Sequence, residues 1–293
     1  MEIKKGKNVQ WMNIQLPSEK DLRWLAKEYK VHPIIIEELR GPSARGRVEA
    51  YKDYLYFIYY FPVYDPTDEA STRAEIDFII TKDTVITVHY DELSQVLIGL
   101  DIKDADSSLA VMYMLIEHLI NFEERQLRHI REKVEAVGKE IFKDKEKEVL
   151  ERITYLKRDV SEYRIVVRLQ GPMMHSLFNK GTKFWGSSAE VYLNDLMGDQ
   201  QKIVNQLEDY REAISDFEDT NNQLMNLKIN TVMKTFTSLS FLTFPFMLLA
   251  ALFSMNTRDT PIIALPYAFW IVFGIMGLGM IGLISYFKRK GWF

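Results

Sequence analysis

Residues 235–253 read TFTSLSFLTFPFMLLAALF, a run without a single charged side chain. At about 1.5 Å per residue, this run would form a helix of roughly 28 Å, close to the thickness of the hydrocarbon core of a bilayer. A second uncharged run occupies 262–287, and only SMNTRDTP (254–261) separates the two. Neither run shows the polar stripe expected of a helix on a soluble protein. The sequence therefore predicts two transmembrane helices joined as a hairpin in a lipid bilayer.

Basic residues gather on one side of this hairpin. Lys228 and Lys234 precede the first run, and KRK (288–290) follows the second, whereas the connecting loop carries one Arg next to an Asp. Basic residues favour the cytoplasmic side of a membrane. We therefore expect both termini in the cytoplasm, the loop outside, and the hairpin in the cell (inner) membrane. The first ten residues hold three Lys and no apolar segment, which is unlike a signal peptide.

Composition narrows the function classes. The net charge of −4 and the lack of a clustered basic segment speak against a nucleic-acid partner. The chain has no Cys, which excludes disulfides, thiol nucleophiles and Cys-based metal sites. There is no nucleophile elbow, P-loop or metal-hydrolase motif, so we do not expect an enzyme. Gly277, Gly279 and Gly282 spell G-x-G-x-x-G, but inside a spanning helix they are expected to allow close helix approach instead.

Residues 1–107 are expected to form a cytoplasmic α/β domain with a mostly antiparallel sheet. Ser18 followed by Asp21 predicts a helix N-terminus, and Pro33 suits the first turn of another helix. The connection 65–72, rich in Pro, Asp, Ser and Thr, predicts a hairpin between two strands. The predicted strands are 9–14, 54–63, 75–81 and 85–90.

From 108 onward the apolar spacing is helical. Long helices are predicted at 108–142, 145–180 and 187–253, with Gly171-Pro172 bending the second and Gly181 and Gly186 breaking the chain before the third. The third would be roughly 100 Å long, and helices of that length pack in bundles. The predicted parts are the long helices and stalk at 108–229, a pore-lining membrane helix at 230–253, an external loop at 254–265, a second membrane helix at 266–287 and a basic tail at 288–293.

A single hairpin cannot enclose a water-filled path, so conduction would need several chains around one axis. Polar residues along one face of the first membrane helix would then line that axis. The candidates are Asn230, Thr237, Ser240 and, in the loop, Asn256. The alternative for Thr237 and Ser240 is that their hydroxyls bond back to helix carbonyls. The stalk from Asp199 to Asp219 is acidic and would attract cations if repeated around an axis.

Several stretches together resemble a known family over essentially the whole chain. They are HPIIIEELRGPSARGRVEAYKDYLYFIYY (32–60), NTVMKTFT (230–237), Pro245, SMN (254–256), PYAFW (266–270) and YFKRKGWF (286–293). In this order and spacing they resemble the CorA family of divalent-cation channels. The resemblance implies a homopentamer in which an α+β cytoplasmic domain forms a funnel, the long third helix lines the pore and the second membrane helix forms an outer ring. It also implies Mg²⁺ influx, with Co²⁺, Ni²⁺ or Zn²⁺ carried by some members.

The family signature at the outer mouth is Gly-Met-Asn, and here it reads Ser254, Met255, Asn256. Asn256 keeps an amide oxygen that can hydrogen-bond to the hydration shell of Mg²⁺, which releases its waters reluctantly. Ser254 lacks the backbone freedom of glycine. Arg258 adds a positive charge beside the mouth, which would weaken the attraction of divalent cations.

The resemblance also maps residues along the pore. Asn230 corresponds to the cytoplasmic entrance, Met233 and Phe236 to a hydrophobic gate, and Phe244 to a further constriction. Rings of apolar side chains block ions by dewetting. The alternative for Met233 and the two Phe residues is ordinary helix packing.

The resemblance further implies a regulatory Mg²⁺ site between neighbouring subunits, with one acid on the stalk and one on the funnel. Asp219 matches the stalk position, and Asp65, with Asp68 as a neighbour, is the predicted funnel partner. Bound Mg²⁺ would bridge the two carboxylates and keep the gate closed.

Two other hypotheses stay open at this point. The first is a relative that carries Zn²⁺ or another transition metal, with or without proton coupling. Its weakness is that the five His residues are scattered; His118 and His129 share a helix face but lie about 16 Å apart. The second is a non-conducting sensor or scaffold, suggested by Ser254 and Arg258.

Overall fold

The structure is a computed structural model that describes residues 1–65, 70–91, 94–97, 99–255, 262 and 266–291. The chain forms two compact units, Met1–Glu218 and Asp219–Phe293. This boundary lies inside the segment 108–229 that was predicted as long helices and stalk. Its position has a physical reason, because the antiparallel helices that flank the stalk turn back near 141–145.

The first unit is built on one six-stranded sheet with the order β1-β2-β6-β5-β4-β3. The strands are β1 (Glu2–Lys5), β2 (Gln10–Gln15), β3 (Val48–Ala50), β4 (Leu55–Asp65), β5 (Ala70–Ile80) and β6 (Thr84–His89). Among the strand pairs of the described residues, β2–β6 is parallel and the others are antiparallel. The four predicted strands and the β4–β5 hairpin are confirmed. The edge strands β1 and β3 were not predicted, because four and three residues are too few to show an alternating pattern.

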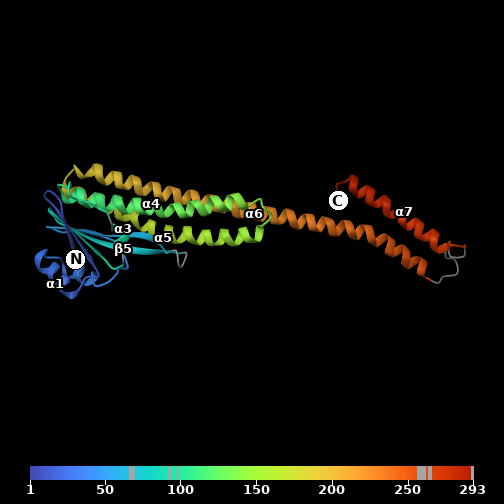
Figure 1. The fold of residues 1–293 in the computed structure, drawn as a ribbon, viewed down its shortest axis with the longest axis horizontal. Coiled ribbons are helices and arrows are strands. Elements are labelled where there is room, and N and C mark those ends of the chain that lie inside the picture. Colours follow the sequence, from blue (N-terminus) through green and yellow to red (C-terminus); the bar gives the residue numbers. More distant parts are fainter. Residues whose placement is uncertain (66–69, 92–93, 98, 256–261, 263–265, 292–293) are drawn as a thin grey trace. The chain divides into compact units, whose positions relative to one another are not determined.

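Successive side chains of β4 point to opposite faces of the sheet. Tyr56, Ile58 and Tyr60 belong to a buried cluster that includes apolar residues of α1 (Glu19–Glu28) and α2 (Pro33–Glu38). Tyr59, on the other face, hydrogen-bonds to Glu123 of α4 (Ser108–Glu140). The sheet is thus the middle of three layers, with α1 and α2 on one side and long helices on the other (Figure 1).

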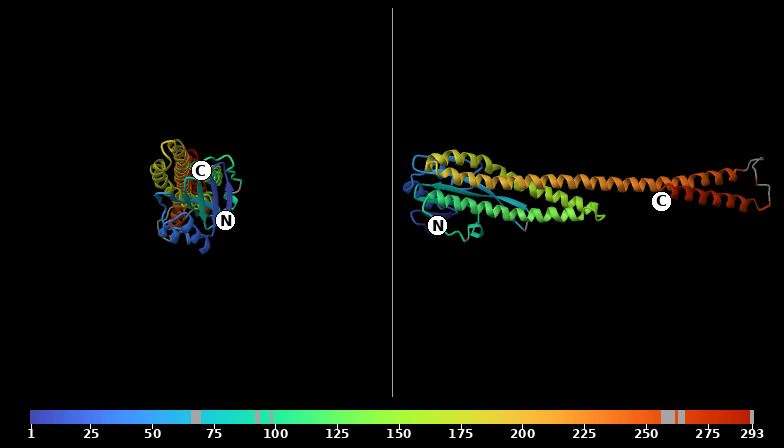
Figure 2. Two further views of the ribbon diagram at one scale, coloured as in Figure 1. Left: turned by 90° about the vertical axis from the view of Figure 1, so that its left-hand side faces the viewer. Right: turned by 90° about the horizontal axis from the view of Figure 1, so that it is seen from above.

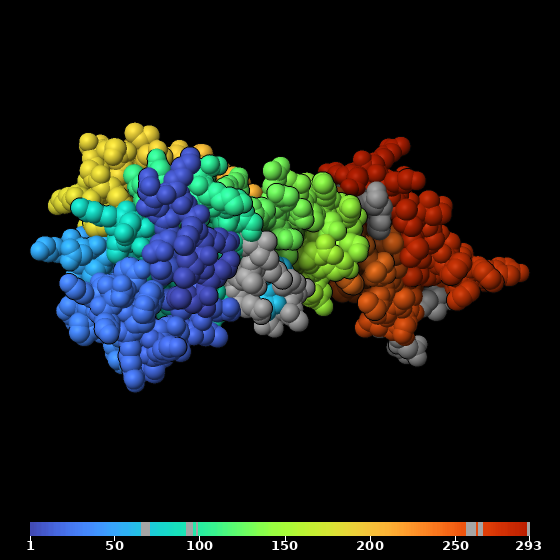
Figure 3. Space-filling view, turned by 60° about the vertical axis from the view of Figure 1, so that its left-hand side comes forward, coloured from blue at the N-terminus to red at the C-terminus, as the bar shows by residue number. Residues whose placement is uncertain are grey.

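Local sequence explains the two short helices. Ser18 caps α1 through a reciprocal capping box with Asp21, as predicted. Pro33 is in the first turn of α2, and the His32 side chain accepts a hydrogen bond from the Ile34 backbone. In the space-filling view, the N-terminal residues in blue form a continuous outer surface on this side of the first unit (Figure 3).

Three long helices follow: α4, α5 (Glu146–Trp185) and α6 (Ala189–Ser254), with the short α3 (Ser94–Leu97) before them. Figure 2 shows α4, α5 and the first part of α6 side by side. α5 is one helix through Pro172, and Gly181 lies inside it. A Cβ on Gly181 would lie 3.0 Å from the Trp185 ring. The prediction that Gly181 breaks the chain is therefore wrong, and the break is at Gly186, which has a φ of 92°.

Ion pairs join α5 to the acidic part of α6. Arg164 pairs with Glu208 at 2.7 Å, and Lys157 pairs with Glu218 at 2.5 Å. On α6 itself, Lys202 and Arg211 pair with acids three residues away. Part of the stalk's negative charge is therefore neutralised within the chain.

The second unit holds the remainder of α6 and α7 (Ala268–Arg289). Both helices contain a window apolar and long enough to cross a membrane, with mean hydropathy of 1.9 and 2.1. α6 continues through Pro245, and α7 begins after Tyr267, whose φ is 67°.

Candidate ion pathway

One face of α6 packs on α7. In the second unit, Ser238 is fully buried, Phe246 is 8% exposed, and Leu242, Leu249 and Phe253 are half-buried. A Cβ on Gly279 of α7 would lie 3.1 Å from the Phe246 ring. The Phe246 ring therefore packs closely against Gly279, which is the close helix approach predicted for this glycine. Gly274, Gly277 and Gly282 have no atom within 4 Å of such a Cβ, so for them close helix approach within the chain is not observed.

The basic ends of the two helices are also connected. The Lys234 ammonium group donates a hydrogen bond of 2.6 Å to the Gly291 carbonyl oxygen, just beyond α7. A cation near the last carbonyls of a helix is electrostatically favourable. This contact ties the C-terminal end of α7 to α6.

The candidate pathway residues lie on the opposite face of α6. At about 100° per residue, they fall in one stripe roughly 120° wide: Asn230, Met233, Phe236, Thr237, Ser240 and Phe244. The centre of this stripe is diametrically opposite the side where Ser238 and Phe246 are buried. All six side chains are exposed, and Phe236 and Phe244 retain 63% and 64% of their accessible surface. We call these residues the α6 stripe.

The hydroxyl groups near the stripe bond to their own helix. Ser240 donates to the Phe236 carbonyl at 2.9 Å, and Thr235 and Thr243 make equivalent bonds to residues four positions earlier. For Ser240 the alternative reading from the sequence is thus confirmed. The hydroxyl oxygen still has lone pairs that can accept a hydrogen bond from water, so a hydrated ion could still meet it.

The outer mouth is described only in part. Ser254 is the exposed last residue of α6, and the Met255 backbone N–H bonds to the Leu252 carbonyl at 3.2 Å. Ser254 is therefore still helical, and α6 ends at this residue. Asn256 and Arg258 lie outside the described residues.

The two predicted regulatory acids belong to different units. Asp65 is half-buried at the end of β4, opposite Ala70 of β5. Asp219 is exposed on α6, at the first residue of the second unit. Their pairing across a subunit boundary stays a prediction, and Asp68 lies outside the described residues.

Among the described residues, no group of three or more His, Asp or Glu side chains is arranged to hold a metal ion. His118 bonds to the Val96 carbonyl at 2.7 Å, and His129 stacks on the Tyr64 ring. His89 is buried and bonds to the Asp91 carbonyl. These three histidines therefore have structural contacts within the described part of the chain.

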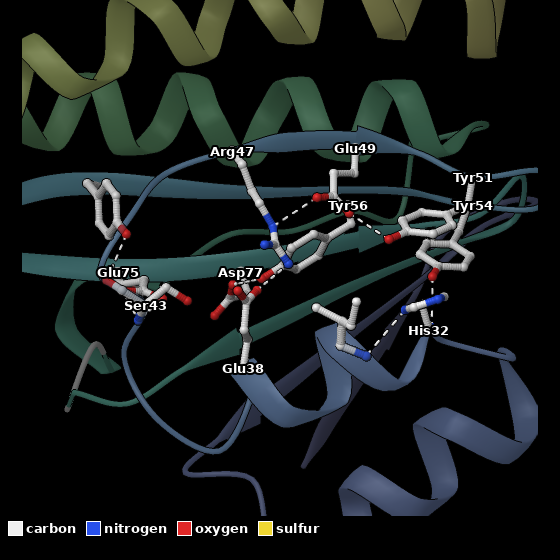
Figure 4. Close-up of polar contacts among 12 residues, drawn as sticks. His32, Glu38, Ser43, Arg47, Glu49, Tyr51, Tyr54, Tyr56, Glu75 and Asp77 are labelled. Atoms are coloured by element: carbon white, nitrogen blue, oxygen red, sulfur yellow. Dashed lines mark hydrogen bonds and ion pairs between the residues drawn. The ribbon is translucent and has the colours of Figure 1, made fainter.

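Four carboxyl groups among the described residues are buried and were not predicted from the sequence. Asp159 of α5 is paired with Lys133 at 2.6 Å, and the other three have no such cation within the described part of the chain. Glu123 of α4 is fully buried, accepts hydrogen bonds from Tyr59 and Gln170, and has its pKa raised by burial to about 8. Glu75 and Asp77 of β5 are buried on the face covered by α1 and α2 (Figure 4). Burial, and next the Glu75 charge, raise the pKa of Asp77 to about 8, and burial also raises the pKa of Glu75.

These features define a membrane protein with two spanning helices, the first of which extends a long helix of an α+β unit. The chain matches the family described as CorA-like Mg²⁺ transporter protein over residues 6–289. It therefore belongs to the CorA-like family.

The relatives cover nearly all of the chain. A cobalt/magnesium transport protein CorA from Thermotoga maritima is 22% identical over 290 residues, which are 96% of this chain and 83% of that protein. The solved CorA magnesium transporter from Methanocaldococcus jannaschii aligns with a TM-score of 0.83 at 19% identity, covering 98% of this chain and 92% of the other. The full-length CmaX protein aligns with a TM-score of 0.65 at 16% identity, covering 97% and 89%. The structural likenesses establish the fold.

Proposed function

We propose that this chain forms a homopentameric membrane channel for hydrated divalent cations, Mg²⁺ first and Co²⁺ second. Membership of the CorA-like family supports the class of activity. The observation that carries the proposal is the α6 stripe, which holds the family's pathway positions on the face of α6 turned away from α7. Because α7 occupies one face, the other face is left for copies of the same helix around an axis.

The exposed aromatic side chains of the stripe support an assembly. Phe236 and Phe244 would face lipid or water in an isolated chain, whereas in a ring of chains they would converge on the axis. Converging apolar rings exclude water from a narrow pore and so oppose ion passage. Met233 and Phe236 then form the gate, and Phe244 forms a further constriction.

At the mouth, we infer that Asn256 presents its amide oxygen to a hydrated ion. Amide oxygens accept hydrogen bonds from the water shell, and Mg²⁺ keeps several of its waters in protein sites. Five copies of Asn256 would form one ring of acceptors, with Ser254 and Met255 setting its geometry. At the other end, Asn230 offers amide oxygens at the cytoplasmic entrance.

Regulation and orientation form part of the same proposal. Asp219 and Asp65 of neighbouring subunits would share a cytoplasmic Mg²⁺ that keeps the channel closed. Two carboxylates held together repel unless a cation lies between them, so loss of Mg²⁺ would loosen the contact. Both termini are cytoplasmic and the hairpin lies in the inner membrane, as the basic residues on one side of it suggest.

The test is flux into proteoliposomes that hold the full chain, with Mg²⁺, Co²⁺, Ni²⁺ and Zn²⁺ measured side by side. We expect Mg²⁺ uptake that internal Mg²⁺ inhibits, and less inhibition in Asp219→Asn. Absence of flux for all four ions in a well-folded pentamer would refute the channel proposal. A variant Ser254→Gly that conducts where the parent does not would favour the non-conducting sensor for the parent. Zn²⁺ flux without Mg²⁺ flux would favour the transition-metal carrier.

A further inference from the structure

The Glu75–Asp77 pair occupies an unusual position for two acids. Both side chains come from β5, an interior strand, and point to the same face of the sheet because they are two residues apart. Glu75 is 3% exposed and Asp77 is fully buried. In register, Glu75 lies opposite Tyr60 and Asp77 opposite Ile58 on β4.

The polar contacts of the pair come almost entirely from neutral donors. Tyr56 and Tyr90 donate their hydroxyl groups to Asp77 at 2.7 and 3.1 Å. The Ser43 backbone N–H lies 2.9 Å from both carboxyl oxygens of Glu75. Glu75 and Asp77 also lie close enough for each to shift the pKa of the other. A proton on one of the two carboxyl groups would let that group donate a hydrogen bond to its neighbour.

The charged groups nearby do not neutralise a second negative charge. Arg47 forms ion pairs with Glu38 on α2 and with Glu49 on β3. Arg73 lowers the pKa of Glu75, but its guanidinium lies over the Tyr60 ring, 4.6 Å from the ring centre, and donates a 3.5 Å hydrogen bond to the Ser43 carbonyl. Two buried carboxylates with this surrounding would repel each other strongly.

The pair also anchors a surface segment. Residues 41–47 (GPSARGR) connect α2 to β3, and Ser43 is the buried member of this segment. Its N–H bonds to Glu75, and its carbonyl accepts the Tyr60 hydroxyl at 2.8 Å. The Ser43 hydroxyl is buried without a hydrogen-bond partner among the described residues. The peptide groups of Ser43 therefore fix the middle of the 41–47 segment beside the two carboxyl groups (Figure 4). The end of the segment is fixed separately by Arg47, whose carbonyl accepts the Ile58 N–H at 3.1 Å and whose guanidinium forms the ion pairs described above.

We propose that Glu75 and Asp77 form a proton-binding site in which one shared proton keeps the 41–47 segment on the sheet, so that proton release and opening of this segment are coupled. When the segment lifts, water reaches the carboxyl groups and both ionise. When it is seated, the pair retains its proton. The site makes the first unit responsive to pH near neutrality, whichever ion the membrane part carries.

Linkage gives the size of the effect. The two states differ by one bound proton over a range of pH. This range begins at the ordinary carboxyl pKa, where the open state loses its proton, and ends at the pKa of about 8 that Asp77 has in the closed state. Over that range the ratio of open to closed segment rises about tenfold per pH unit, and above about pH 8 it levels off.

The test is amide hydrogen exchange by mass spectrometry on the full chain in nanodiscs, corrected for intrinsic exchange, from about pH 6 to about pH 9. We expect protection of 41–47 to fall about tenfold per pH unit and to level off near pH 8. Asp77→Asn keeps the shape, cannot ionise and leaves Glu75 as the titrating member of the pair, so the slope is expected to end at a lower pH than in the parent. Glu75→Gln retains one buried carboxyl but removes the neighbouring charge, so the levelling point should move to lower pH.

Glu123→Gln is the matched control, because it also neutralises a buried carboxyl but on the opposite face of the sheet; its 41–47 slope should equal that of the parent. Infrared spectroscopy provides a second readout, a protonated-carboxyl band that disappears with the same titration and is altered in Asp77→Asn. A flat profile in the parent, or a profile unchanged in both Asp77→Asn and Glu75→Gln, would overturn the proposal. None of these readouts depends on ion flux, so failure of the channel proposal would leave this one standing.

Discussion

Glu123→Gln should make the protein more stable at alkaline pH, although it removes a hydrogen-bonding carboxyl from the core. Burial raises the pKa of Glu123 from about 4.5 to about 8 in the folded chain. The unfolded chain ionises near the lower value, so it releases a proton that the folded chain retains between these two pH values. Neutral Glu123 therefore contributes fully to the free energy of unfolding below about pH 4.5, and this contribution is lost as the pH rises to about 8.

The magnitude follows from the same shift. About 3.5 pKa units at about 1.4 kcal/mol each give roughly 5 kcal/mol, as an upper value for the loss between the two ends of the range. Glutamine has nearly the same shape and stays neutral. Its amide can donate to the Gln170 side-chain oxygen, which is buried without a partner among the described residues. The variant therefore keeps the contacts and loses the ionisation.

The assay is the melting temperature of the full chain in detergent, measured at intervals from about pH 5 to about pH 8.5. At about 2–4 °C per kcal/mol, the parent should lose roughly 10 °C more than Glu123→Gln across this range. Ionisation of Asp77 and Glu75 lowers the melting temperature of both proteins equally. The difference between the two curves of melting temperature against pH therefore reports Glu123 alone. Parallel curves would refute the reasoning, because they would mean that Glu123 ionises in the folded state as easily as in water.

Three further outcomes are expected. Gly279→Leu forces the Phe246 ring away and should lower the stability of the second unit by about 1–3 kcal/mol, seen as a lower melting temperature, whereas Gly277→Leu, in open space, should have little effect. Phe236→Ala widens the proposed gate and should raise the cation leak into liposomes at saturating internal Mg²⁺. The control Phe273→Ala, on the exposed face of α7, should leave the leak unchanged. Equal leak from both variants would argue against a gate at Phe236. Ser18→Ala removes the cap of α1 and should lower the stability of the first unit by about 1 kcal/mol, measured by denaturant unfolding, and an unchanged midpoint would contradict the capping role.

The membrane helices and long cytoplasmic helices were predictable because their signals are long. A charge-free run of 19 residues or a helical repeat over 30 residues leaves few alternatives. Ser18 and Pro33 also give local signals with a direct physical meaning, and both were confirmed. Gly181 was misread because a glycine in a helical pattern marks either a break or a close contact, and only the position of the Trp185 ring distinguishes the two.

The buried acids were harder to predict for two different reasons. Glu123 had a signal, because it follows Leu119 and Ile120 by three or four residues on the apolar face of its helix. Glu75 and Asp77 alternate with Ile76 and Phe78, which is the pattern of a strand with one wet face. The layer of α1, α2 and the 41–47 segment covers that face, and no local pattern in β5 reports a layer contributed by a distant part of the chain.

The two opposite faces of α6 have a consequence for genetics. Phe246 contacts Gly279 of its own chain, so a defect there can be corrected by a second substitution in the same gene copy, and it harms only the chain that carries it. The stripe that contains Phe236 would be shared by all chains around one axis. In a cell that expresses two alleles, a stripe substitution should therefore be dominant, whereas a substitution on the α7 side should be recessive.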